Sequence, residues 1–201
     1  MEGKYFKKLL GQKCYLSPIS LEDVNYYTEW LNDFSVTLNL GLSGVNITLE
    51  KEKELLKKLS NEYVFAIIDK ESNKLIGSTG LHHVDLINGN AEFGINIGDK
   101  NFWNRNYGTE ATMLILDYGF NILNLHNIHL RVLAFNNRAL KCYEKVGFKT
   151  IGKLTEVRQI AGERFDMVIM EILAKDFKGD FIKKALNEVK QEKAGLDLKL
   201  V

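Results

Sequence analysis

The spacing of apolar residues along the chain predicts alternating strands and helices. Phe93, Ile95 and Ile97 alternate with other residues, as on a strand with one apolar face. Leu21 and Val24 begin an apolar stripe with intervals of three and four residues, as on an amphipathic helix. Strands are expected at residues 13–19, 63–68, 74–83, 91–97, 127–134, 148–154 and 166–173, helices at 20–32, 48–59, 109–123 and 138–146, and a loop at 33–46.

The order of these elements predicts a mixed sheet. The three strands between residues 63 and 97 follow one another through polar turns, such as Asn88-Gly89, and should form a meander. The later strands alternate with helices, which act as crossover connections. Adjacent hairpins together with crossover helices indicate an α/β (α+β) fold rather than an all-parallel sheet.

Composition and charge are those of an ordinary globular domain. The chain has 201 residues, of which 45% are hydrophobic. Its 27 lysines and arginines nearly balance 26 aspartates and glutamates, so we expect neither nucleic acid nor a membrane as partner. No apolar run approaches the roughly 20 residues of a membrane helix, and the first residues lack a signal-peptide stretch, so we expect a cytoplasmic protein.

A highly charged segment ends the chain. Residues 1–175 are expected to form a single domain, and residues 176–201 a charged helix and tail. A narrow apolar stripe runs along this helix, from Phe177 to Val189. The helix either lies solvated on the surface or binds a partner.

The cysteines and histidines show no spacing typical of a metal site. Cys14 and Cys142 lie far apart, and we expect both to be core thiols. The four histidines form no pair at helical spacing on one face. We therefore expect no metal.

A glycine-bearing turn before the helix at Thr109 predicts an anion site. Free N–H groups and the positive end of the helix dipole meet at such a helix start. Arg105 adds a positive charge, and Gly108 permits close approach of a ligand. The two common nucleotide loops, with Gly-x-x-x-x-Gly-Lys-Ser/Thr or Gly-x-Gly-x-x-Gly spacing, do not occur. By itself, however, the feature is generic.

Two motifs at a suitable separation resemble the GNAT N-acetyltransferase superfamily. Residues 97–111 read IGDKNFWNRNYGTEA, and residues 136–148 read NNRALKCYEKVGF. Within that superfamily they are similar to the branch of ribosomal-protein alanine and spermidine acetyltransferases, and the resemblance covers about residues 14–173. It implies a GNAT-like mixed, mostly antiparallel sheet of six to seven strands flanked by helices.

The first motif departs from the family pattern in its small residues. The family form is Gln/Arg-x-x-Gly-x-Gly/Ala, and Arg105, Gly108 and Glu110 occupy its three marked positions. Members often carry glycine where this chain has Asn104 and Asn106. Because asparagine tolerates positive φ better than most residues, the loop can still form.

The resemblance implies that acetyl-CoA binds between the strands at 91–97 and 127–134. Asn136 matches the family asparagine that bonds the cofactor arm, and it is equally suited to cap the following helix. The pantetheine arm is expected on the backbone of Ile95 and Ile97, and the pyrophosphate on the N–H groups of Arg105, Asn106, Tyr107, Gly108 and Thr109.

The resemblance also implies catalytic roles. Tyr143 matches the tyrosine that protonates the departing CoA thiolate in many members; the other interpretation is an aromatic core residue. Glu92 is our candidate for the group that takes the amine proton, and a salt-bridged strand glutamate is the competing interpretation. His82 and His83 are alternatives, of which adjacency on a strand should let one face the cleft.

The predicted function is transfer of an acetyl group from acetyl-CoA to a primary amine by direct attack. The amine belongs to a small molecule or a protein N-terminus, and the sequence allows a homodimer. The competing hypothesis is a non-catalytic acyl-CoA sensor or interaction module. Four acidic residues favour a cationic amine or are simply solvated: Asp33, Glu50, Glu52 and Glu54.

Overall fold

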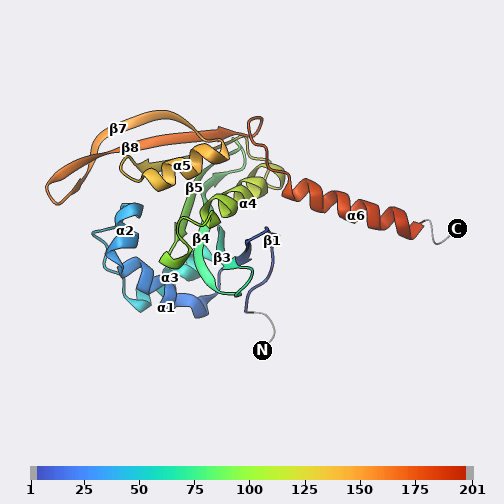
Figure 1. Ribbon diagram of the computed structural model, residues 1–201, viewed down its shortest axis with the longest axis horizontal. Helices are drawn as coiled ribbons and strands as arrows, with labels where there is room; N and C mark the ends of the chain where they lie inside the picture. Colours follow the sequence, from blue (N-terminus) through green and yellow to red (C-terminus); the bar gives the residue numbers. More distant parts are fainter. Residues whose placement is uncertain (1–3, 198–201) are drawn as a thin grey trace.

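One mixed sheet organises the computed structural model, which describes residues 4–197 (Figure 1). Within those residues the sheet has eight strands, in the order β1-β2-β3-β4-β5-β6-β8-β7. The strands are β1 (Leu9–Leu10), β2 (Cys14–Pro18), β3 (Tyr63–Asp69), β4 (Leu75–Asp85), β5 (Asn90–Ile97), β6 (Asn127–Leu133), β7 (Lys149–Ile160) and β8 (Glu163–Leu173).

The pairing confirms the predicted mixed, mostly antiparallel sheet. In the described chain β5 and β6 are the one parallel pair, and all other neighbours run antiparallel. The strand count exceeds the six to seven expected because β1, at the sheet edge beside β2, has two residues and no readable pattern.

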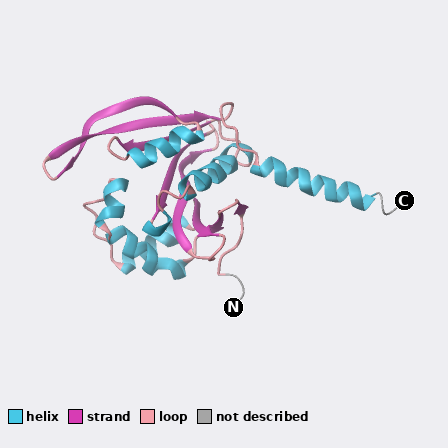
Figure 2. Cartoon of the chain, in the orientation of Figure 1, coloured by secondary structure: helices cyan, strands magenta, loops and turns pink. Residues whose placement is uncertain are grey.

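Helices cover both faces of the sheet (Figure 2). Successive side chains of β3 point to opposite faces, so Phe65 and Ile67 join one core while Val64 joins the other. The first core includes residues of α4 and α5, and the second includes residues of α1, α2 and α3. The helices are α1 (Val24–Asn32), α2 (Phe34–Leu40), α3 (Leu49–Leu59), α4 (Tyr107–Asn121), α5 (Asn137–Val146) and α6 (Phe181–Asp197), with 3₁₀ turns η1 (Leu21–Asp23) and η2 (Lys100–Phe102).

Helix α2 lies where the sequence predicted a loop. The Asp33 side chain accepts a hydrogen bond from the Ser35 N–H at 2.9 Å and so caps the helix start. Gly41 ends the helix in the left-handed region, with φ 69°. Val36 is buried in the core beneath α1 and α3. Both end signals are present in the sequence, but the seven-residue helix between them is too short to show a period.

The hairpin of β7 and β8 is longer than predicted. The expected strands ended at residue 154 and began at residue 166, whereas the ladder continues to Ile160 and Glu163. Ala161 and Gly162 form its turn with φ of 50° and 85°, the positive values that suit a tight hairpin. An Ala-Gly turn is a weak sequence signal, which explains the difference.

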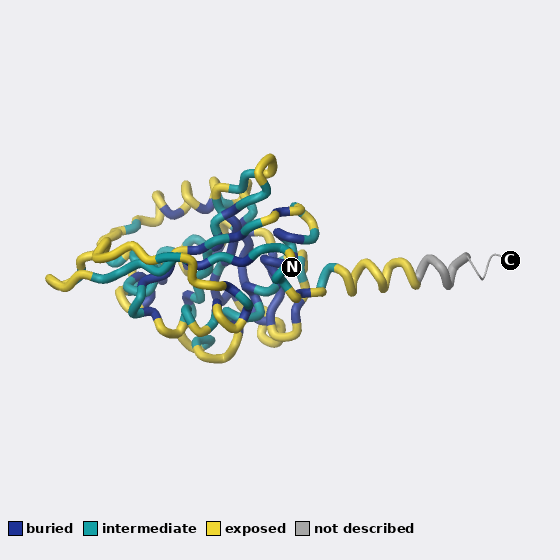
Figure 3. Tube along the Cα trace, turned by 90° about the horizontal axis from the view of Figure 1, so that it is seen from above, coloured by how far each residue is buried: buried dark blue, intermediate teal, exposed yellow. Residues whose placement is uncertain are grey.

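Helix α6 projects from the rest of the chain as an arm (Figures 1 and 3). Its first turn is attached by the Ile182 N–H, which donates to Asp117 at 3.0 Å. Beyond Ile182 the described side chains are exposed. None of the helices within residues 4–197 has the length and apolar character needed to span a bilayer.

Glu110, the departure from the first motif, fastens α4 to the turn before β2. Its carboxylate accepts from the N–H groups of Lys13 at 2.8 Å and Cys14 at 3.1 Å. Gly11 in the same turn has no room for a side chain, since a Cβ there would lie 2.2 Å from the Glu110 Oε1 atom. Glu110 therefore links α4 to this turn through hydrogen bonds that a small residue could not accept.

Replacing Glu110 by alanine should destabilise the fold. Two backbone donors, one of them on the fully buried Cys14, lose a charged acceptor, and we expect unfolding to become easier by about 1–3 kcal/mol. Urea unfolding measures the change. Glu144→Ala, at an exposed position on α5, is the control and should change stability by less than about 0.5 kcal/mol. Equal stabilities of the two variants would contradict the role given to Glu110.

Candidate functional site

The sheet opens where β5 and β6 separate. Described pairing between them ends at the Glu92 and His129 rung, after which β6 continues beside β8. The Gly98 N–H donates to the Ile76 carbonyl on β4. Because bonded and non-bonded pairs alternate along an antiparallel ladder, the backbone groups of Ile95 and Ile97 face the opening instead. These are the groups expected to receive the pantetheine arm.

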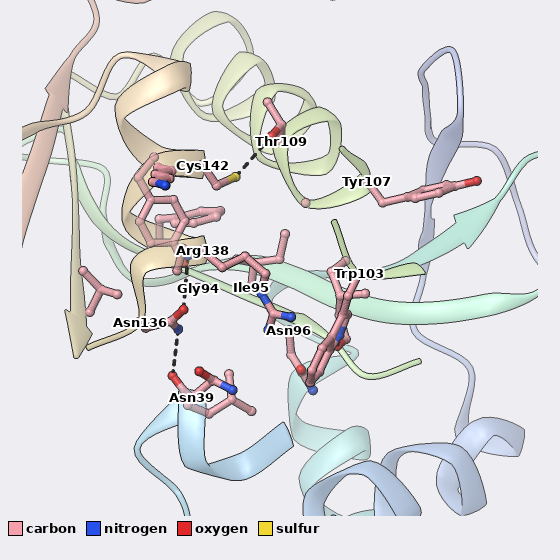
Figure 4. Close-up of a pocket in the computed structure, with 18 of the residues that line it drawn as sticks. Asn39, Gly94, Ile95, Asn96, Trp103, Tyr107, Thr109, Asn136, Arg138 and Cys142 are labelled. Atoms are coloured by element: carbon pink, nitrogen blue, oxygen red, sulfur yellow. Dashed lines mark hydrogen bonds between the residues drawn. The ribbon is translucent and has the colours of Figure 1, made fainter. Parts of the chain in front are cut away.

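A cavity of about 910 Å³ fills this opening (Figure 4). Its size falls within the range of small-molecule sites. It is lined by residues of α2, β4, β5, β6 and α5 and of the segment before and at the start of α4. The lining includes these residues singled out from the sequence: His82, His83, Glu92, Ile95, Ile97, Asn106, Tyr107, Gly108, Thr109, Asn136 and Tyr143.

The N-terminus of α4 is open to a ligand. The helix begins at Tyr107, two residues before the predicted start. Asn104 and Asn106 have φ of 58° and 65°, which confirms that asparagine takes the left-handed positions where glycine is usual. In the described chain the Asn106 side chain does not cap α4, and it accepts instead from the Lys145 ammonium at 3.3 Å. Asn106 therefore provides no side-chain acceptor for the first N–H groups of α4.

Arg105 does not bring its charge to the cavity. Its guanidinium lies 5.4 Å from the ring centre of Phe102 and 5.7 Å from that of Tyr107. As far as the described residues go, the lining takes in both neighbours of Arg105 but not Arg105 itself. The guanidinium expected beside the anion site therefore stacks on these two rings and does not line the cavity.

The cations that line the cavity come largely from α5. Lys141 and Lys145 lie on successive turns of this helix, and Arg138 lies in its first turn. The Arg138 guanidinium stacks 3.8 Å from the ring centre of Trp103, whose Nε1 donates to the Ile97 carbonyl at 2.7 Å. Sequence reasoning missed these cations, although Arg138, Lys141 and Lys145 are spaced by three and four residues along the chain.

The Tyr107 phenol anchors the start of α4. It donates to the Asp69 carboxylate at 2.7 Å, in a buried contact at the end of β3. Burial and this bond raise the pKa of Tyr107 to about 12, so the phenol stays protonated. In Figure 4 its ring points away from the other labelled side chains, which leaves its backbone as the part available to a ligand.

Tyr143 both lines the cavity and packs in the core. Its ring meets Phe93 and Phe148 in edge-on contacts, with centroids 5.8 and 5.9 Å apart. Burial, and secondarily the neighbouring Cys142 thiol, raise the pKa of Tyr143 well above its usual value. The two interpretations offered by the sequence are thus compatible: a buried phenol that remains protonated at neutral pH can still donate into the cavity.

Asn136 links two elements across the cavity. Its side-chain oxygen accepts from the Ala139 N–H at 3.1 Å, which is the predicted helix cap. Its Nδ2 donates to the Asn39 carbonyl on α2 at 3.2 Å, and both bonds are drawn in Figure 4. The amide therefore has one N–H left for a ligand.

Proton-accepting groups line the cavity on β4 and β5. Glu92 forms two bonds with Arg131, at 2.9 and 3.2 Å, so the salt-bridged state considered for it is present. His82 faces Glu92 in the strand register, and burial lowers the pKa of His82 below its usual 6.5. His83 lines the cavity as well, contrary to the expectation that one histidine would, because its φ of 51° breaks the strand alternation.

The four acidic residues considered for binding a cationic amine lie outside the cavity lining, as far as it is described. Asp33 pairs with Lys100 at 2.5 Å. Glu52 is buried, and Glu50 and Glu54 are exposed on α3. Across the described residues, no three His, Cys, Asp or Glu side chains are grouped as a metal ion would require.

Comparison with known proteins agrees with this geometry. Residues 13–149 match the family described as acetyltransferase (GNAT) domain. A spermidine N(1)-acetyltransferase of Vibrio cholerae is 35% identical over 127 residues, which are 59% of this chain and 71% of the relative. An uncharacterized N-acetyltransferase p20 of Bacillus licheniformis is 26% identical over 185 residues, or 89% of this chain and 100% of the relative.

Solved structures show the same fold. The spermidine N-acetyltransferase of Vibrio cholerae in complex with CoA and spermine superimposes with a TM-score of 0.75 at 27% identity, covering 83% of this chain and 98% of that chain. A GNAT acetyltransferase of Bacillus anthracis has a TM-score of 0.73 at 21% identity, covering 83% and 98%.

Lys145 contacts Asn106 beside the open start of α4, and we predict that its charge contributes to CoA binding. Lys145→Gln should raise the CoA dissociation constant about three- to fivefold, because it removes a charge beside the open start of α4. Arg105→Gln, the matched control, should change it less than about twofold, since that guanidinium stacks outside the lining. Isothermal titration with CoA measures both. A larger effect at Arg105 than at Lys145 would contradict this arrangement.

Proposed function

Because the chain belongs to the GNAT acetyltransferase family, whose members use acetyl-CoA, we propose that it acetylates a primary amine by direct attack. The observation that carries the proposal is the content of one cavity. It collects an uncapped helix N-terminus, the unpaired edge of β5, a buried phenol and proton-accepting side chains. The acceptor is proposed to be a small-molecule amine or a protein N-terminus.

The residues at the opening fit the groups of acetyl-CoA. We propose that the N–H groups at the start of α4 and in the loop before it bind the pyrophosphate, with Lys145 beside them. The backbone of Ile95 and Ile97 and the free N–H of Asn136 would bind the pantetheine arm. When bound, acetyl-CoA supplies the activated acetyl group. The pyrophosphate site is proposed from the backbone of Arg105, Asn106, Tyr107, Gly108 and Thr109.

Tyr143 is proposed to donate a proton to the leaving sulfur. Its raised pKa keeps the phenol protonated at neutral pH, and its contacts with Phe93 and Phe148 hold the ring in one orientation. The incoming amine must lose a proton as well. We propose that Glu92 accepts it, directly or through a water molecule, and that His82 on the opposing strand is the second group able to do so.

The Tyr143→Phe variant tests the reaction. The wild-type chain should release free CoA thiol from acetyl-CoA in the presence of primary amines, and the variant should release it at least 100-fold more slowly (roughly the contribution of a general acid). Phenylalanine keeps the ring packing, so the CoA dissociation constant should not change. Thiol release followed with a colorimetric reagent gives the rate.

Two outcomes of that experiment would count against the proposal. CoA binding without thiol release for any amine would indicate the sensor function instead. Parallel lines in a steady-state analysis with both substrates varied would indicate a covalent acetyl-enzyme and exclude direct attack.

Glu92→Gln should lower kcat about 100-fold at pH 7 with unchanged CoA binding, because the amine proton loses its acceptor. His82→Gln is the matched control on the opposing strand and should keep at least about a tenth of kcat. The pH profile of kcat/KM distinguishes the two groups. A neutral imidazole accepts a proton only above its pKa, so a role for His82 would give the profile an acid limb below pH 6.5 that His82→Gln removes and Glu92→Gln keeps.

A further inference from the structure

Arg131 crosses the opening at the point where β5 and β6 separate. It lies two residues beyond the last described rung of the parallel pair, on β6. Its Nε and one terminal nitrogen bind the two oxygens of Glu92, at 2.9 and 3.2 Å. The Glu92 side chain is 18% exposed and that of Arg131 is 54% exposed, and both residues line the cavity. The carboxylate is thus largely enclosed, while the guanidinium keeps free N–H groups.

The lining of the cavity has a strong imbalance of charge. Among the described residues Glu92 is its one carboxylate, and Arg131 neutralises it. The remaining charged groups of the lining are cations, namely Arg138, Lys141 and Lys145, of which Lys145 is proposed to lie beside the CoA pyrophosphate. On the side of α2 the lining is neutral, with Val36, Asn39 and Leu40. Beyond Glu92, which is proposed to meet the reacting amine, this described lining offers no carboxylate to a second ammonium group.

A second positive charge on the acceptor would therefore be poorly tolerated. A polyamine that gives up one proton for the reaction still carries ammonium groups along its body. An ammonium that leaves water needs a carboxylate or several hydrogen-bond acceptors, and its loss of hydration is costly without them.

We infer that Arg131 is a specificity-determining residue, which neutralises Glu92 and so selects primary amines without a second positive charge over polyamines. This inference rests on the proposed function, because it concerns the acceptor of the same reaction. It would set the chain apart in acceptor preference from relatives described as spermidine acetyltransferases. The uncharged wall at Val36 and Leu40 suits an acceptor whose body is neutral.

Two acceptors of similar length test the inference. Spermidine carries additional ammonium groups, and a methoxy-capped oligo(ethylene glycol) amine replaces them by ether oxygens. In the wild-type chain kcat/KM should favour the ether amine by at least about tenfold, and Arg131→Gln should shift the ratio toward spermidine by at least about tenfold. The ratio cancels changes in CoA binding and in the chemical step, so a general loss of activity does not affect it.

Two further variants separate charge from structure. Arg131→Lys keeps the positive charge and should keep a ratio close to that of the wild type. Arg164→Gln, at an exposed residue of β8 outside the described lining of this cavity, should leave the ratio unchanged. If Arg131→Gln turns over neither acceptor, calorimetric binding of the two amines to the CoA-bound variant supplies the ratio.

The outcomes are distinguishable. A wild-type chain that uses or binds spermidine as well as the ether amine would overturn the inference, as would an unchanged ratio in Arg131→Gln. Either result leaves acetyl transfer itself intact. Absence of thiol release across a broad panel of primary amines would instead overturn the proposed function.

Discussion

The separation of β5 from β6 is the constraint on which the rest of the structure depends. A strand inside a sheet normally satisfies its N–H and C=O groups on both sides, and groups left without partners inside a protein are costly. Beyond Glu92 the edge of β5 loses its described partner in β6. The Trp103 indole satisfies the Ile97 carbonyl, and the rest of this edge is available to a ligand with its own amide groups. The sheet thus has an open strand edge at this point, which the bound substrate is proposed to complete.

The same opening requires the start of α4 to be fixed in position. The start of α4 can serve as an anion site only while its position is fixed and its N–H groups stay free. Tyr107 fixes it on one side through Asp69, and Glu110 on another through the turn before β2. Asn106 keeps a left-handed backbone and gives its side chain to Lys145 rather than to the helix. Tyr107 and Glu110 thus fix the position of the helix start, whereas Asn106 leaves its N–H groups free.

Much of this could be predicted from the sequence, for reasons that are local. The alternation of Phe93, Ile95 and Ile97 describes the strand beside the opening correctly. The left-handed asparagines and the Asn136 cap follow from the intrinsic behaviour of that residue. What could not be predicted depends on side-chain direction. Arg105 stacks on Phe102 and Tyr107 instead of lining the cavity, and the positive φ of His83 breaks the strand alternation; periodicity reveals neither.

The bonds of Asn136 also have a consequence for enzyme kinetics. One amide side chain caps the start of α5 and donates to the carbonyl of Asn39 on α2. Its remaining N–H is proposed to bind the pantetheine arm of the donor, and α2 provides the neutral wall proposed for the acceptor. A displacement of α2 or of the start of α5 would therefore move the Asn136 side chain, which is bonded to both. The two substrates of such an enzyme need not bind independently, and their Michaelis constants would vary together.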